Sequence, residues 1–180
     1  MLKKLFVAAI MSVFVVVGQI NLCGAMPYRE MFLGGFTVGS SYPEMVRAYG
    51  QPVRDKSHAE DNYTARYGNS VEIGYNGTSN KIQHITVTAN NGWKTPSGLA
   101  VGMNISDALD MYGEPDYKEI GANKTAYCHF HRDRKNYLDY GFVILFNNKS
   151  GKILELSLLG GSRMADYEQI YKNHLEKMVK

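Results

Sequence analysis

The hydrophobic positions of this chain follow two periods, one typical of short helices and one typical of strands. Residues 42–49 and 105–112 carry apolar side chains three and four positions apart, which is the spacing of one helical face. A residue that caps helices, Ser41 or Asn104, precedes each segment, and a Tyr-Gly-x-Pro string ends it. The pattern predicts one short helix in each half of the chain.

Three strands are expected after each helix, because short apolar segments separated by turn residues follow it. The turns Asn76-Gly77 and Asn147-Asn148 fold the second strand of each set onto the third. The tail, residues 162–180, has helical spacing and either packs on the sheet or reaches a partner. The expected strands are about 63–67, 70–75 and 82–88 in the first half, and about 125–131, 140–146 and 152–159 in the second.

The two halves repeat one sequence pattern. Five residues recur at an offset of 63, namely Val38, Gly39, Tyr49, Gly50 and Pro52 as Val101, Gly102, Tyr112, Gly113 and Pro115. The second copy carries about eight extra residues, placed most simply in a hairpin near 132–139. We therefore expect an α+β fold of two tandem helix–β-β-β repeats, 26–92 and 93–161. Their antiparallel sheets would join into one concave sheet with the helices on one face, followed by a C-terminal helix.

The repeated motif also suggests a family. The string hydrophobic-x-hydrophobic-Gly-x-[Ser/Asn]-x-x-[Asp/Glu]-hydrophobic, followed by Tyr-Gly-x-Pro, resembles the signature of the small outer-membrane assembly lipoproteins, the SmpA/OmlA family. Two such units in tandem, over residues 36–159, resemble the β-lactamase-inhibitor-protein arrangement. The resemblance implies one concave sheet that grips a protein partner, and a role as an extracytoplasmic protein-binding module.

The first 25 residues have the layout of a signal peptide. Lys3 and Lys4 precede a nearly continuous apolar run over 5–17, and small residues lead to a cleavage position after Ala25. Export follows, to the periplasm, the cell envelope or the medium. Membrane attachment would require an uncleaved segment or a lipid on Cys23, which follows Leu22 rather than a small residue. After cleavage a single cysteine remains, so no internal disulfide is expected.

Charge and motifs exclude several classes of function. The formal net charge is +3, and loss of the two leader lysines leaves eighteen basic against seventeen acidic side chains. This balance is not that of a nucleic-acid-binding protein. The sequence contains no phosphate-binding glycine loop, nucleophile elbow, zinc-protease motif or paired metal-cysteine motif. We expect a monomeric, non-catalytic protein without a cofactor.

Strand alternation predicts which residues lie on the sheet face away from the helices. From the first half this face would carry Arg66, Glu72, His84, Thr86 and Thr88. From the second half it would carry Tyr127, His129, His131, Val143, Leu145, Glu155 and Ser157. The second set is rich in aromatic and apolar residues for a solvated surface, which favours a partner-binding face. The candidate contact residues are Arg66, His84, Tyr127, His129, His131, Val143 and Leu145, with Tyr137 of the hairpin insertion as a further candidate.

The alternative is a small-ligand or metal-binding exported protein. On a strand His129 and His131 point to the same side and are candidate metal ligands, whereas Cys128 points the other way. Two histidines do not complete a metal site, so we expect Cys128 to be a small core residue and the histidines to lie on the surface.

Overall fold

A computed structural model describes residues 26–57, 61–133, 138–162 and 167–180. The predicted signal peptide, residues 1–25, and the candidate residue Tyr137 lie outside the described residues. None of the helices in the described ranges is both long enough and apolar enough to cross a membrane.

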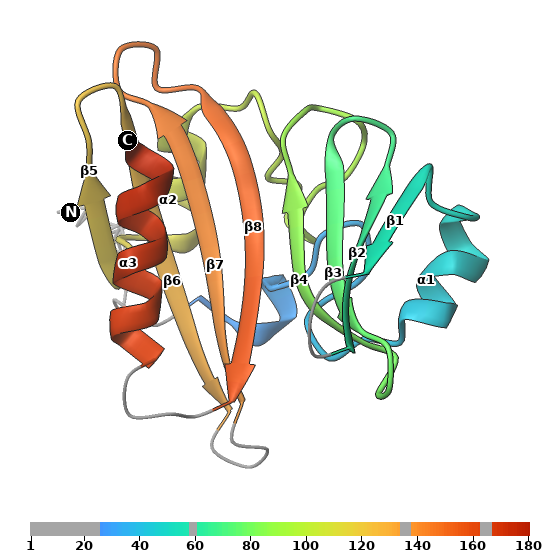
Figure 1. Ribbon diagram of the computed structural model, residues 1–180. Coiled ribbons are helices and arrows are strands. Elements are labelled where there is room, and N and C mark those ends of the chain that lie inside the picture. Colours follow the sequence, from blue (N-terminus) through green and yellow to red (C-terminus); the bar gives the residue numbers. More distant parts are fainter. Residues whose placement is uncertain (1–25, 58–60, 134–137, 163–166) are drawn as a thin grey trace, which may run out of the picture.

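The protein has an α+β fold built around one antiparallel sheet of eight strands (Figure 1). The strands are β1 (Arg54–Ser57), β2 (Asn62–Tyr67), β3 (Val71–Asn76), β4 (Lys81–Val87), β5 (Tyr117–Ile120), β6 (Lys124–Asp133), β7 (Leu138–Asn147) and β8 (Ile153–Ser162). The helices are η1 (Tyr28–Glu30, one 3-10 turn), α1 (Tyr42–Tyr49), α2 (Ile105–Tyr112) and α3 (Tyr167–Val179). The strand order is β1-β2-β3-β4-β8-β7-β6-β5, so β4 and β8 join the two halves edge to edge.

The two short helices end as the sequence predicts. Gly50 and Gly113 follow the helices with φ of +83° and +74°, a backbone region that glycine adopts at low cost. At the start of α2 the Asn104 backbone N–H donates to Asp107 Oδ2 at 2.9 Å, which is one half of the expected capping box.

The main core lies between the sheet and the two short helices. Tyr42 and Met45 of α1 and Ala108 and Tyr112 of α2 are buried on it, together with the apolar residues of the segment that precedes α1. We call this side the helix-side face; its strand residues are Ala65, Val71, Ile73, Tyr75, Ile82, Ile85, Val87, Phe142, Ile144, Leu156 and Leu158. The core continues across the β4–β8 junction, so the two halves share it.

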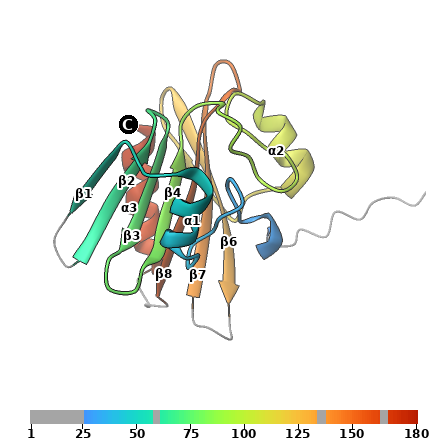
Figure 2. The ribbon, with the colours of Figure 1, turned by 90° about the vertical axis from the view of Figure 1, so that its right-hand side faces the viewer.

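The C-terminal helix packs on the opposite face, which corrects the expectation that this face is open throughout. Figure 2 shows α3 behind the strands, across the sheet from α1. Leu175 and Val179 of α3 form a second, smaller apolar cluster with strand residues of the second half, namely Ala126, Cys128, Val143 and Leu145.

Each half has four strands where the sequence predicted three. The additional strands, β1 and β5, form the two edges of the sheet. Their sequences, Arg-Asp-Lys-Ser and Tyr-Lys-Glu-Ile, are short and mostly charged, as is common for exposed edges. Without apolar alternation they carry no strand signal in the sequence. The extra residues of the second half lengthen the β6–β7 hairpin, since both strands have ten residues.

Candidate functional site

The structure divides the predicted binding face between the two sides of the sheet. Cys128 lies opposite Val143 in the β6–β7 ladder, and Tyr127 lies opposite Ile144. Directly opposite residues share a face, so Tyr127, His129 and His131 belong to the helix side and not to the side of Val143. The expectation that these residues form one surface is therefore wrong. A shift of one residue in the register between two strands moves every side chain of one strand to the other face of the sheet. The length of the β6–β7 hairpin did not determine this register.

Val143 and Leu145 do lie away from the short helices, but α3 covers them. They are 0% and 5% exposed and pack against Leu175 and Val179. The amphipathic tail thus buries the apolar residues that the sequence analysis assigned to a partner.

The three aromatic candidates of β6 are packed on the helix side. His129 is 2% exposed, with its ring 6.1 Å from that of Tyr112, and burial lowers the pKa of the imidazole. The expected surface position of this histidine is wrong. Tyr127 is half-buried with its ring 4.9 Å from that of Phe146.

His131 is also half-buried, at the end of β6 near the N-terminal segment. Its ring centroid lies 5.3 Å from that of Tyr28 and 6.3 Å from that of Tyr140. In the described part of the chain no group of three or more His, Cys, Asp or Glu side chains is placed to hold a metal ion.

Arg66 and His84 remain on the solvent side of the sheet. They lie on β2 and β4, beside rather than beneath α3 (Figure 1). Together with the residues opposite them in the ladders they form a polar surface across β2, β3, β4 and β8. We call this surface the open face; its residues are Arg66, Glu72, His84, Thr86 and Glu155, with the buried Ser157 beneath them at 1% exposure.

Glu72 is the centre of the charged part of the open face. Arg66 donates to Glu72 Oε2 from Nε at 2.9 Å and from Nη2 at 2.6 Å. On the other side of the carboxylate, His84 Nε2 lies 3.8 Å from Oε1. Strands β2, β3 and β4 thus each contribute one side chain to a polar cluster at the surface.

Gly74 explains how His84 reaches this position. A Cβ atom at residue 74 would lie 2.0 Å from Cε1 and 2.2 Å from Nδ1 of His84, so the imidazole lies directly over the glycine backbone. Glycine weakens a strand interior and often marks a close approach of another group. Here it allows the ring to lie on β3, the strand that carries Glu72.

A row of hydroxyl groups crosses the junction between the two halves. Ser157 donates its hydroxyl proton to Glu155 Oε1 at 2.7 Å, and the hydroxyls of Thr86 and Ser157 are 3.0 Å apart. Because the single Ser157 proton is already donated, Thr86 is the donor in the second bond. The direction of both bonds is therefore set by the Glu155 carboxylate.

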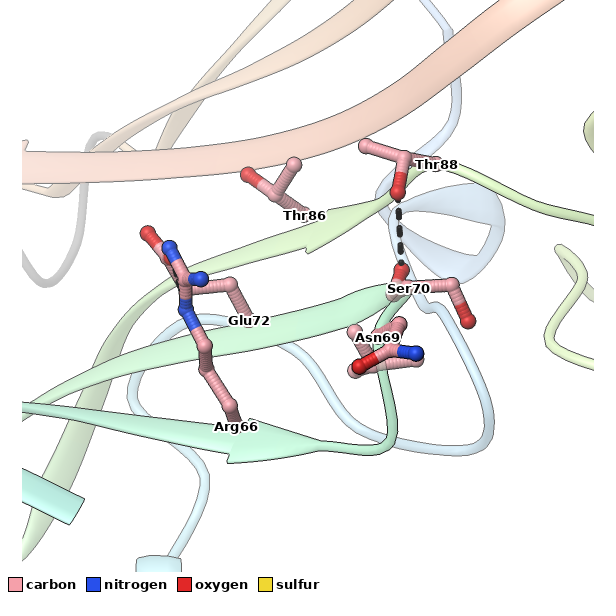
Figure 3. A pocket seen from close by; sticks show the side chains of 7 residues that line it. Arg66, Asn69, Ser70, Glu72, Thr86 and Thr88 are labelled. Atoms are coloured by element: carbon pink, nitrogen blue, oxygen red, sulfur yellow. Dashed lines mark hydrogen bonds and ion pairs between the residues drawn. The ribbon is translucent and has the colours of Figure 1, made fainter. Parts of the chain in front are cut away.

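A shallow cavity of about 150 Å³ lies on the open face beside the turn between β2 and β3 (Figure 3). Its lining residues come from β2, β3, the turn between them and the end of β4: Arg66, Asn69, Ser70, Val71, Glu72, Thr86 and Thr88. Strand alternation predicted the face of four of these residues, but the cavity has no signal in the sequence, because the turn residues Asn69 and Ser70 carry no motif.

Comparison with known proteins assigns no family. No protein-family model matches the chain, and no curated protein matches it. Two of the solved structures to which the chain is similar are secreted or extracellular bacterial proteins. One is an extracellular protein containing an SCP domain from Bacillus anthracis str. Ames, with a TM-score of 0.47, 10% identity, and coverage of 68% of this chain and 44% of that chain.

The other is a cysteine-rich secretory protein from Staphylococcus aureus subsp. aureus Mu50. The TM-score is 0.49, the identity is 12%, and the match covers 73% of this chain and 46% of that chain. The chain therefore spans less than half of the length of either protein, and similarity at this level assigns no function.

These findings correct the resemblance to the SmpA/OmlA and β-lactamase-inhibitor proteins. No model of either family matches the chain, and the two solved structures named above are an SCP-domain protein and a cysteine-rich secretory protein. The physical reason is that the motif encodes a helix end. Val-Gly before the cap and Tyr-Gly-x-Pro after the helix provide turn glycines and a stop. Any short helix that leads into a meander can use these residues.

Proposed function

We propose that this protein is an exported, non-catalytic binding module whose open face contacts a protein partner. The observation that carries the proposal is the unequal covering of one sheet face. Helix α3 covers the apolar residues of the second half, whereas the strands β2, β3 and β4, which carry the polar residues of the first half, lie beside it (Figure 1).

The side chains of the open face are held in place before any partner binds. Glu72 is shared by Arg66 and His84, and Glu155 orients Ser157 and Thr86. A partner would therefore order few long side chains on binding, which lowers the entropic cost of association. The mixture of charge and hydroxyl groups is typical of non-obligate protein interfaces, which are about as polar as the rest of the surface.

The proposal also includes export of the protein and an origin of its two halves by duplication. Export rests on the sequence of residues 1–25, with its short basic start and apolar run. Duplication rests on the recurring motif and on the order of elements, since α1 and α2 are each followed by four strands of one sheet. In this view the second copy acquired α3 on its outer face, and the first copy kept that face for binding.

The test is site-specific cross-linking in the mature protein, residues 26–180. A photo-reactive residue at Thr64, which neighbours His84 on the same side of the sheet, is expected to capture a defined protein from envelope or culture-fluid extracts. The same group at Lys149, in the exposed β7–β8 turn, is the matched control.

The captured partner then allows affinity measurements. His84→Ala should weaken its binding about tenfold, since a contact residue is worth roughly 1 kcal/mol or more. Lys149→Ala should leave binding unchanged. Equal capture at both positions, or unchanged affinity of the His84 variant, would show that the open face is not the interface.

A further inference from the structure

We propose that the cavity beside Arg66 binds a neutral polyhydroxylated ring, the chemistry of a sugar unit. This site shares Arg66, Glu72 and Thr86 with the protein interface proposed above. Its recognition groups also include Asn69, Ser70 and Thr88, which the interface does not use.

The charges of the cavity favour a neutral ligand. Its only charged side chains are Arg66 and Glu72, which are paired with each other at 2.6 Å. An anion would have to compete with Glu72 for the guanidinium, and a cation would have to compete with Arg66 for the carboxylate. A neutral polar ligand leaves this pair intact.

The β4 side of the cavity presents hydrogen-bond acceptors. Thr86 donates its proton to Ser157, because the Ser157 proton is held by Glu155. Thr88 donates its own proton to the Ser70 carbonyl at 3.4 Å. Both threonines line the cavity, and with both protons used inside the protein their oxygens can only accept a hydrogen bond from a ligand.

The β2 side and the β2–β3 turn present donors. The Ser70 hydroxyl accepts a bond from the Asn91 amide at 2.8 Å, and no described residue accepts its proton. The guanidinium of Arg66 uses Nε and Nη2 for Glu72, which leaves Nη1 for a ligand. The Asn69 amide lies in the turn between them and adds both kinds of group (Figure 3).

A hydroxyl group matches this arrangement because one oxygen both donates and accepts. A ring with several hydroxyls donates to Thr86 and Thr88 on β4 and accepts from Arg66 and Ser70 across the cavity. The volume of about 150 Å³ holds several water molecules, so a single ring that displaces them fits better than a large ligand. A small, open site of this kind gives affinities in the millimolar range.

The test is an NMR titration of ¹⁵N-labelled mature protein with neutral sugars: glucose, galactose and N-acetylglucosamine. We expect at least one of them, at millimolar concentration, to shift the amide signals of Asn69, Ser70, Thr86 and Thr88. Glucuronate and glucosamine, which carry a charge on a similar ring, should bind more weakly. No shift with any neutral sugar, or equal binding of the charged compounds, would overturn the proposal.

A matched pair of variants checks the hydrogen-bonding role. Thr88→Val keeps the shape and removes the oxygen, so affinity should fall about fivefold, whereas Thr88→Ser should retain it. Thr78→Val, in the β3–β4 turn, is the surface control. Equal affinity of the Val and Ser variants at residue 88 would exclude the site.

Sedimentation of the protein with insoluble bacterial cell-wall polysaccharide distinguishes a free sugar ligand from a polymeric one. If added monosaccharide releases the protein from the pellet, the site binds a terminal or free sugar. If the protein stays in the pellet, the site binds a sugar unit within a chain. Because Thr88 lies outside the protein interface, Thr88→Val should leave binding of the protein partner unchanged, so the two proposals fail separately.

Discussion

At the scale of single residues, the packing of His84 over Gly74 is the most constrained contact of the open face. The imidazole occupies the volume that a side chain at residue 74 would fill, and it lies next to the Glu72 carboxylate. Residue 74 therefore acts through His84, and its role is to position that ring. Any larger residue there forces the histidine off β3.

Gly74→Ala should consequently destabilise the protein by about 1–3 kcal/mol, the usual cost of overpacking a fixed contact. In a His84→Ala background the same change should cost less than about 0.5 kcal/mol, because the obstructing ring is gone. Urea unfolding of the four proteins in this cycle measures the coupling. An equal loss of unfolding free energy in both backgrounds would mean that the position of the His84 ring does not depend on Gly74.

The sequence predicted the positions of some site residues and missed others for a definable reason. Arg66 and His84 were placed correctly because β2, β3 and β4 are joined by short turns, so alternation alone fixes their side. Tyr127 and His129 were misplaced because their side depends on the register across the long β6–β7 hairpin. The contact between Gly74 and His84 joins neighbouring strands and has no signature within either one.

At the scale of secondary-structure elements, α3 is the part that decides which surfaces the protein presents. It buries Val143, Leu145 and the thiol of Cys128 in a cluster separate from the main core. Burial also raises the pKa of that thiol, so it is unreactive while the helix is docked. The exposure of Cys128 therefore reports on the docking of α3.

Leu175→Ala in the mature chain should weaken this docking by about 2–5 kcal/mol, as for other buried leucines. The rate at which a thiol reagent labels Cys128 in the native protein should then rise at least about 30-fold, because opening of the helix limits the reaction. Glu176→Ala, at an exposed position of the same helix, is the control. A labelling rate unchanged by Leu175→Ala would show that α3 does not protect the thiol.

The sequence predicted the helices and strands that bury an apolar side and missed those that do not. Helices α1 and α2 and the six central strands follow the apolar pattern, since each buries one side in the core. The edge strands β1 and β5 bury too little for a pattern. The amphipathic tail gave a helix, but it did not reveal which face of the sheet the helix would cover.

At the scale of the whole molecule, the two halves share one sheet and one main core. Strands β4 and β8 pair from His84 to Val87, and the main core contains side chains from both halves. Trp93, the only tryptophan of the chain, lies within the second half, yet its ring is 4.7 Å from that of Tyr49 in the first. Neither half would keep its core covered alone.

Equilibrium unfolding in urea should therefore show one transition for the mature protein. Trp93 fluorescence, which reports on the main core, and thiol labelling of Cys128, which reports on the cluster under α3, should give the same midpoint. Two separated midpoints would instead mean that the halves or the tail helix unfold independently.

The charges of the edge strand β5 bear on how this protein behaves at high concentration. Two copies can extend their sheets by pairing β5 with β5 only about a two-fold axis perpendicular to the sheet, so residues from the same face come opposite each other. In the registers with most overlap, Lys118 meets Lys118 or Glu119 meets Glu119, and like charges in that position repel. Although Ile120 is 72% exposed on this edge, the strand thus carries its own protection against edge-to-edge pairing of two copies.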